Sequence, residues 1–316
     1  MKTLVLGLDC DPTIVHFLQA CQVAGFAVDA VNVRELADHG EWDLSIPPSA
    51  DDYIKIGEKR WILDDYAGVY ARLIDLTWKQ RDERIKQRWF ALMTSLRAWL
   101  QASSRVVINP PFAGSHNSAK PLHEVALTAL GFRVPPSLTT SDRASLVSFA
   151  AQGPVIVKAL GGSRGNTREV DQDALAAFMP EQGPVHVQRL IEGTDVRVHV
   201  IGPDVIATHM ESDAIDYRAR GVRVRFRPWT LPRQLSAQLA EAMELMGLRL
   251  AGWDFKLDAG GLYWCLEANP QPGYHPYDKS AGGEISRAIM KFLETCDRLP
   301  ASQEGRRCEL PARDRA

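Results

Sequence analysis

Two alternating segments near the C-terminal end constrain the fold more than any other feature of this 316-residue sequence. Apolar and polar residues alternate on both sides of the pair Gly260-Gly261, which predicts a β-hairpin with one apolar face. The apolar positions are Trp253, Phe255 and Leu257, followed by Leu262, Trp264 and Leu266. The polar or mixed positions are Asp254, Lys256 and Asp258, followed by Tyr263, Cys265, Glu267 and Asn269.

The hairpin loop decides which acids oppose each other. With Gly260-Gly261 as the loop, Asp254 lies directly across from Glu267, whereas a loop at Ala259-Gly260 would break this pairing. Two carboxylates opposed at about 5 Å repel each other, and a divalent cation would compensate that repulsion. Asn269 adds a third oxygen on the same face, and such oxygens suit Mg²⁺ bound together with substrate phosphates. We therefore predict a Mg²⁺ site, although a solvated face with ordinary surface acids has the same pattern.

A metal site with few protein ligands predicts phosphate-binding groups elsewhere in the chain. Lys158 ends an apolar strand at residues 155–159, and a glycine-bearing turn follows at 161–166. Glycines allow backbone amides to approach phosphate oxygens, and Lys158 would add a point charge. The order of a Walker loop is absent. The alternative is a plain glycine-rich hairpin tip with a surface lysine.

Polar side chains also mark two later segments. Gln188 ends a predicted strand, and Asp195 and Arg197 share one face of the next. A polar strand end suits an adenine, and an acid suits ribose hydroxyls. Further on, Arg223, Arg225 and Arg227 alternate with apolar residues, which predicts a strand with one basic face. That face suits either an anionic substrate or simple surface ion pairs.

The pattern of the rest of the chain predicts two kinds of architecture. Residues 3–31 give a β-α-β start without a dinucleotide fingerprint, and this favours a parallel sheet. A hairpin centred on Gly57 and a strand ending at Asn109-Pro110-Pro111 follow, and antiparallel hairpins dominate from residue 154. We predict an α/β N-terminal domain and an α+β body. The predicted helices cover residues 78–101, 119–130, 142–151, 233–246 and 283–296.

Composition excludes several classes of protein. The chain is 45% hydrophobic and 24% charged, as globular proteins are. A net charge of −2 gives no general attraction to nucleic acid or anionic membranes, so we expect neither as a partner. The first residues lack signal-peptide features, and no apolar run reaches membrane-spanning length. The five scattered cysteines indicate a reduced, cytoplasmic protein.

The order of these residues resembles that of the ATP-grasp ligases. The sequence is most similar to the RimK-type glutamate ligases and the microviridin-type (graspetide) peptide macrocyclases. The most specific pieces are EANP at 267–270, DVRVHVIG at 195–202 and DYR at 216–218. The likeness covers roughly residues 105–295 and, more weakly, the N-terminal domain.

The resemblance implies a role for each matching residue. Lys120 and Lys158 would hold ATP phosphates under a lid at 161–166, which includes Gly161, Gly162 and Ser163. Gln188, Arg189, Leu190 and Ile191 would form the adenine hinge, and Asp195 would meet the ribose. Asp254, Glu267 and Asn269 would ligate Mg²⁺, with Mn²⁺ as an alternative. Arg197 and Arg218 would supply positive charge in catalysis, Arg218 beside the acyl phosphate or the acceptor.

The resemblance also implies a fold and a reaction. Two α+β subdomains would enclose ATP behind an N-terminal α/β (pre-ATP-grasp) domain, with divisions at 1–110, 111–190 and 191–298. The polar, charged composition of the last residues separately predicts a flexible tail at 299–316. We expect an ATP-dependent ligase that activates a carboxylate as an acyl phosphate and joins it to an amine. Alternatives are a macrocyclase that forms ester or amide cross-links in a precursor peptide, a small-molecule kinase and an inactive nucleotide-binding homologue. A homodimer is left open.

Overall fold

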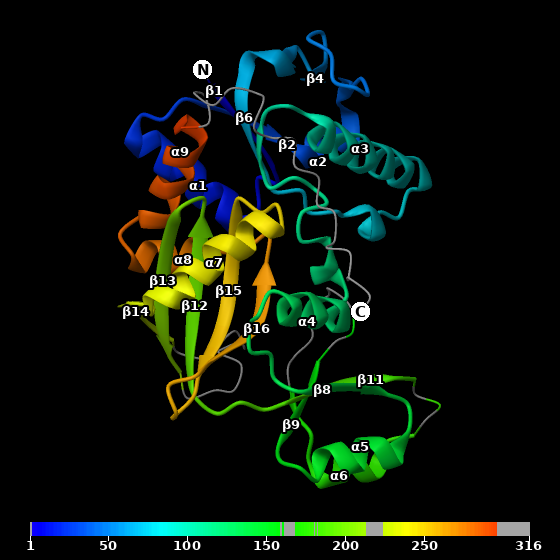
Figure 1. The fold of residues 1–316 in the computed structure, drawn as a ribbon. Coiled ribbons are helices and arrows are strands. Elements are labelled where there is room, and N and C mark those ends of the chain that lie inside the picture. Colours follow the sequence, from blue (N-terminus) through cyan, green and yellow to red (C-terminus); the bar gives the residue numbers. More distant parts are fainter. Residues whose placement is uncertain are drawn as a thin grey trace, which may run out of the picture.

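The structure of the chain is a computed structural model that describes residues 2–158, 160, 168–179, 181, 183–212 and 224–295. Figure 1 shows an N-terminal sheet with its helices, a small lobe built on a second sheet, and a large third sheet. A short hairpin sheet extends from the N-terminal part. No helix within the described ranges has the length and apolar character that crossing a membrane requires.

The N-terminal sheet is parallel, as the β-α-β start predicted. Its strands, in spatial order, are β2 (Val28–Asn32), β1 (Lys2–Gly7), β6 (Tyr66–Ala71) and β7 (Val106–Ile108). The helices of this part are α1 (Pro12–Ala24), α2 (Val33–His39) and α3 (Glu83–Ala102), and Leu63–Asp65 and Thr77–Lys79 form the 3-10 turns η1 and η2. The helix predicted at 78–101 begins later because Asp82 caps it, accepting hydrogen bonds from the amides of Arg84 and Ile85.

The hairpin centred on Gly57 is confirmed. Gly57 has a φ of 58°, which a glycine adopts without strain, and joins β4 (Tyr53–Ile56) to β5 (Lys59–Ile62). β3 (Glu41–Asp43) adds to β4 and completes this small antiparallel sheet.

The small lobe consists of an antiparallel sheet covered on one face by two helices. Its strands, in spatial order, are β10 (Arg168–Glu169), β9 (Val155–Lys158), β11 (Val185–Arg189) and β8 (Ser137–Thr140). Its helices are α5 (Arg143–Ala150) and α6 (Gln172–Ala177). The apolar core on this face contains Leu146, Leu175, Phe178 and Val187. Lys158 and His186, which pair in the ladder, therefore lie on the opposite face from Val187.

The large sheet is antiparallel and has helices on both faces. Its strands, in spatial order, are β14 (Arg225–Trp229), β13 (Asp204–Glu211), β12 (Thr194–Ile201), β15 (Leu250–Leu257) and β16 (Tyr263–Asn269). Helix α7 (Arg233–Leu245) packs on the face that carries Val196, Val198 and Val200. Helices α8 (His275–Ser280) and α9 (Glu284–Thr295) pack on the other face.

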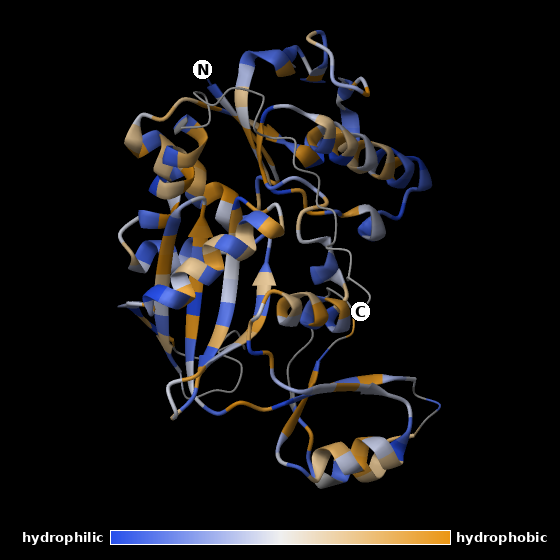
Figure 2. Cartoon of the chain, in the orientation of Figure 1, coloured by the Kyte–Doolittle hydropathy of each residue, from blue (hydrophilic) through white to orange (hydrophobic). Residues whose placement is uncertain are grey.

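One apolar core joins the N-terminal sheet to the large sheet. Val5, Phe17 and Tyr70 share it with Ile201 and Ile289. The apolar colouring of the inner strands in Figure 2 follows these cores. Helix α4 (Lys120–Ala129), preceded by the 3-10 turn η3 (Ser115–Ser118), lies between the small lobe and the large sheet (Figure 1). The predicted fold class, an α/β part followed by an α+β body, is confirmed, and the tail from residue 296 lies outside the described residues.

Candidate functional site

Asp254 faces Glu267 across the β15–β16 ladder, as the alternation predicted. The loop length and the pairing along the hairpin differ from the prediction. Its loop is one residue longer than predicted and covers residues 259–261, because the Asp258 amide donates to the carbonyl of Leu262 at 3.1 Å. The register shifts between Asp254 and Phe255, and in the described ladder no β15 residue pairs with Leu266. This β-bulge restores the opposition of the two acids.

The bulge also changes which residues of β16 face the core. Cys265 and Ala268 are buried against Trp253 and Phe255. Leu266 is only partly buried and takes no part in that core, so the predicted apolar face of Leu262, Trp264 and Leu266 is wrong. A strict two-residue alternation cannot continue through a bulge, since the extra residue reverses the faces.

Each of the two opposed acids meets a cation. Arg197 Nη1 lies 2.7 Å from Asp254 Oδ1, and the two side chains are only 5% and 7% exposed. Lys120 Nζ donates to Glu267 Oε1 at 2.9 Å. The repulsion that the hairpin predicts is thus compensated by protein side chains in this structure.

The donor set fits Mg²⁺. Asn269 pairs with Gly252 in the ladder, and its Oδ1 accepts a hydrogen bond from the Gln271 amide at 2.8 Å. Within the described ranges, no group of three or more His, Cys, Asp or Glu side chains is placed to hold a metal ion. A metal here would therefore need the amide oxygen of Asn269 or phosphate oxygens beside Asp254 and Glu267, which is the ligand chemistry that Mg²⁺ accepts.

On the small lobe, Lys158 belongs to a buried polar cluster centred on Glu124 of α4. Glu124 Oε1 accepts from Gln188 Nε2 at 2.7 Å and lies 3.1 Å from His186 Nε2. Lys158 Nζ lies 4.0 Å from the same oxygen. Burial alone would raise the pKa of Glu124, but hydrogen bonds from His186 and Ser137 and the charge of Lys158 hold it below its ordinary value. Sequence reasoning missed Glu124, because nothing local distinguishes one acid on an amphipathic helix.

Lys158 links this cluster to the hairpin acids. Burial lowers the pKa of Lys158, the charges of Glu124 and Glu267 oppose that shift, and the charge of Lys120 adds to it. These four groups therefore interact electrostatically, although they come from β9, β16 and α4. The amide of Lys120 also donates to the carbonyl of Leu160, two residues after Lys158, at 3.0 Å.

The predicted hinge divides into residues with different surroundings. Gln188 is fully buried, and its Oε1 has no hydrogen-bond partner among the described residues. The side chain of Arg189 turns to the other face of the strand, where it donates to the carbonyls of Gly153 and Phe149 and stacks on the Phe149 ring. The Arg189 side chain therefore braces the small lobe, and a hinge role for Arg189 stays a prediction that concerns its backbone.

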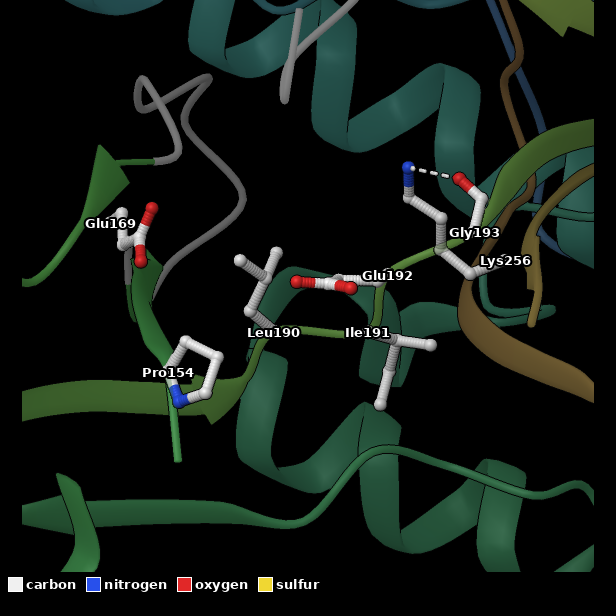
Figure 3. Close-up of a pocket in the computed structure, with 7 residues that line it drawn as sticks. All are labelled: Pro154, Glu169, Leu190, Ile191, Glu192, Gly193 and Lys256. Atoms are coloured by element: carbon white, nitrogen blue, oxygen red, sulfur yellow. Dashed lines mark hydrogen bonds between the residues drawn. The ribbon is translucent and has the colours of Figure 1, made fainter. Parts of the chain in front are cut away.

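Leu190 and Ile191 line an open cavity of about 370 Å³ between the small lobe and the large sheet. Its other lining residues are Pro154, Glu169, Glu192, Gly193 and Lys256. Figure 3 shows Leu190 and Glu192 along one side of the cavity, with Glu169 and Lys256 at opposite ends. Sequence reasoning missed Glu192 and Lys256 as cavity residues.

Asp195 lies beside this cavity through its contact with Lys256. Lys256 Nζ donates to Asp195 Oδ2 at 2.9 Å and to the carbonyl of Gly193 at 3.3 Å (Figure 3 shows the second contact). Asp195 and Arg197 lie on the same face of β12, as predicted, since they pair with Lys256 and Asp254 of β15.

Other predicted residues lie outside the described residues or away from the site. Gly161, Gly162, Ser163, the lid at 161–166 and Arg218 fall in segments that the structure does not describe. The basic face of β14 is on the wrong side of the sheet for a contact with the hairpin acids. Arg227 pairs with His209, and His209 with Val196, so all three share the α7 side, opposite Arg197. Arg227 instead forms a 2.9 Å ion pair with Glu211.

Arg72 connects the N-terminal sheet to the segment that follows β16. It is buried, pairs with Asp11 and donates to the carbonyls of Gln271 and Pro272 at 2.8 and 3.0 Å. It therefore fastens the segment after β16 to the N-terminal sheet.

Comparison with known proteins supports the resemblance. No family model matches the chain. Probable alpha-L-glutamate ligases of Shewanella amazonensis and Trichodesmium erythraeum are 28% and 29% identical to it over 197 and 205 residues. These matches cover 58% and 59% of this chain, which spans 63% and 67% of the length of those curated relatives.

Solved structures match over almost the whole chain. The ATP-grasp ligase PsnB complexed with minimal precursor has a TM-score of 0.78 at 25% identity, covering 94% of this chain and 99% of PsnB. The macrocyclase MdnC bound with precursor peptide MdnA from Microcystis aeruginosa has a TM-score of 0.79 at 19% identity, covering 93% of this chain and 99% of MdnC. Together with the hairpin, the small lobe and the cavity between them, these matches identify the chain as a member of the ATP-grasp superfamily.

Proposed function

We propose that this chain is an ATP- and Mg²⁺-dependent ligase that joins a carboxylate to an amine through an acyl phosphate. One observation carries the proposal. Two opposed carboxylates, each held by a cation, lie at the edge of the large sheet that faces the Lys158 cluster of the small lobe. A nucleotide placed in the cavity with its phosphates toward Lys158 would meet both groups of charges.

The residues have distinct roles in this proposal. Lys120 and Lys158 would hold phosphate oxygens, and Lys120 would release Glu267 as it does so. Asp254, Glu267 and Asn269 would hold Mg²⁺ or Mn²⁺, which neutralises phosphate charge and polarises the transferred phosphoryl group. Gln188 to Ile191 would enclose the adenine, with the buried Gln188 Oε1 as an unused acceptor.

The remaining charged residues would complete the site. Asp195 would exchange its contact with Lys256 for ribose hydroxyls. Arg197 and Arg218 would supply fixed positive charge where negative charge develops. Glycines and Ser163 in the 161–166 segment would approach the phosphates through their backbone amides.

The proposed reaction balances in two steps. A substrate carboxylate oxygen attacks the γ-phosphorus of ATP, and ADP leaves. The acceptor amine then attacks the acyl carbon and loses a proton as inorganic phosphate leaves with its electron pair. A hydroxyl acceptor would give an ester by the same step. No nucleophilic side chain of the protein is needed, so positioning and charge supply the catalysis.

A peptide substrate is the second candidate. The curated relatives are named as glutamate ligases, but their matches cover under two thirds of this chain. The PsnB and MdnC structures, which contain precursor peptides, match over more than nine tenths of it, including the N-terminal part. We therefore include peptide cross-linking among the proposed activities, in a cytoplasmic protein that is either a monomer or a homodimer.

Two measurements test the proposal. Calorimetry with Mg²⁺ and AMPPNP should show binding to the wild type and about tenfold weaker binding to Lys158→Ala, because a charge-assisted phosphate contact is lost. ADP release should depend on a carboxylate substrate, and hydroxylamine should trap the acyl phosphate as a hydroxamate. The probes are free glutamate and glutamate-containing peptides.

The outcomes separate the rival functions. Absence of AMPPNP binding would contradict the proposal. ADP release with a stable phosphorylated product and no amide would identify a kinase. Nucleotide binding without ADP release on any probe would favour an inactive homologue.

A further inference from the structure

The outer edge of β16 is held by contacts other than a neighbouring strand. β16 is the last strand of its sheet, so its outward amides need different partners. The Cys265 amide donates to the carbonyl of Arg133 at 2.7 Å, and the Ala268 amide donates to His123 Nε2 at 2.9 Å. These two contacts flank the bulge and Glu267. The edge is therefore fastened on both sides of the residue that the proposed function makes a metal ligand.

His123 has a defined ring orientation and tautomer. It is 1% exposed, and its Nδ1 lies 2.8 Å from Nδ1 of His116, with the two rings stacked. Because Nε2 accepts from a backbone amide, the ring proton of neutral His123 must sit on Nδ1. Nδ1 then donates to His116, which leaves the His116 proton on Nε2. Burial lowers the pKa of both imidazoles, that of His123 to about 3, which agrees with two neutral rings.

Helix α4 reaches β16 at two points one turn apart. Lys120 contacts the Glu267 carboxylate, and His123, three residues later on the same helix face, contacts the next backbone amide. The lysine contact would be exchanged when phosphates bind. The histidine contact would remain, because it involves neither the carboxylate nor a phosphate-binding group.

We propose that His123 is a positioning residue for Glu267, and that His116 fixes the tautomer which this role requires. The inference rests on the proposed function insofar as Glu267 is taken to bind Mg²⁺. The bulge gives β16 an extra residue at Leu266, so the ladder alone leaves the strand room to shift there. The His123 contact anchors the strand at Ala268 and holds the carboxylate opposite Asp254. Partners that orient a metal ligand typically affect metal affinity about 10–100-fold.

The first test uses the ligand-free protein. Long-range ¹H–¹⁵N spectra should show His123 protonated at Nδ1 and His116 at Nε2. The Ala268 amide should exchange slowly with solvent in the wild type and at least tenfold faster in His123→Leu. A His123 ring protonated at Nε2, or unchanged exchange in the variant, would overturn the inference.

The second test measures metal dependence. His123→Leu should raise the Mg²⁺ concentration for half-maximal ADP release about tenfold, while the affinity for metal-free ADP stays unchanged. His123→Gln should restore most of the Mg²⁺ response, since its amide oxygen can accept from Ala268 and its amide nitrogen can donate to His116. His39→Leu, at an exposed position of α2, is the matched control.

The outcomes distinguish positioning from a general structural role. A lower melting temperature with an unchanged Mg²⁺ response in His123→Leu would refute positioning, as would an equal loss in His123→Gln. If the wild type released no ADP, the proposed function would fail. The tautomer and amide exchange would still decide the role of His123.

Discussion

Gly252 leaves the space that the Arg197 guanidinium occupies, and this predicts a large effect for one added methyl group. A Cβ built at Gly252 would lie 2.0 Å from Arg197 Nη2 and 2.7 Å from Pro272 Cβ. Arg197 cannot swing away cheaply, because it is buried and paired with Asp254 at 2.7 Å. Gly252→Ala should therefore displace the guanidinium from Asp254.

The expected cost follows from two known effects. Overpacking a close-packed interior costs about 1–3 kcal/mol, and breaking a buried ion pair costs about 3–5 kcal/mol. Because the arginine can relax in part, we expect a loss of about 3 kcal/mol in the free energy of unfolding, where the two ranges meet. Binding of Mg²⁺ and AMPPNP should weaken as well, since Asp254 would lose its orientation.

Urea unfolding followed by tryptophan fluorescence measures the loss in the free energy of unfolding. The same substitution made in an Arg197→Ala variant identifies the cause of that loss. In Arg197→Ala, the further change Gly252→Ala should cost about 1–2 kcal/mol, less than in the wild type, because the close contact with Pro272 remains but the contact with the guanidinium does not. Gly273→Ala is the control glycine, since its Cβ would meet nothing closer than Thr13 Oγ1 at 3.8 Å. An equal loss from Gly252→Ala in both backgrounds would refute the reasoning.

Three further predictions concern the acids of the site. Glu267→Gln keeps a hydrogen-bonding group beside Lys120 but removes a charge, so ADP release should fall at least tenfold. The control is Glu244→Gln, at an exposed position. Near-normal turnover at saturating Mg²⁺ would contradict the metal site. Glu124→Gln should weaken AMPPNP binding about tenfold in calorimetry, because the carboxylate that orients Gln188 and faces Lys158 is lost, whereas exposed Ser148→Ala should not. Since the folded pKa of Glu124 lies below its ordinary value of 4.5, its ionised form stabilises the fold above that pH. That contribution is lost as the pH falls through the folded value, so Glu124→Gln should lose less stability in acid unfolding than the wild type does.

Local sequence patterns predicted the elements better than the contacts between them. The turn at Gly57 and the opposition of Asp254 and Glu267 both follow from neighbouring residues or a short hairpin. The loop of that hairpin was predicted one residue too short, because glycine at both 260 and 261 allows either turn. Beside the bulge, the Cys265 amide donates to the carbonyl of Arg133, a partner distant in sequence that no local pattern indicates.

The candidate site could be predicted only where charge must be compensated. Opposed acids require cations, and this requirement indicated a site without identifying Lys120 as a partner of Glu267, 147 residues away. Arg189 shows the converse limit. A cation in a predicted hinge suggests a ligand contact, yet strand alternation places it on the Phe149 side, opposite Gln188. Which face of the strand packs on the core of the small lobe and which faces the candidate site is known only once the sheet has been assembled.

Helix α4 gives a physical reason why nucleotide and metal should bind cooperatively. Within one and a half turns, Lys120 and His123 contact β16 and Glu124 contacts β11. A phosphate that binds Lys120 takes the lysine charge away from the neighbourhood of Glu267. The Glu267 carboxylate then attracts a divalent cation more strongly. The cation in turn lowers the cost of bringing phosphates beside Asp254. Linkage requires these two effects to be equal in free energy. The ratio of AMPPNP affinities with and without Mg²⁺ should therefore shrink in Lys120→Met, where Glu267 has no lysine to release.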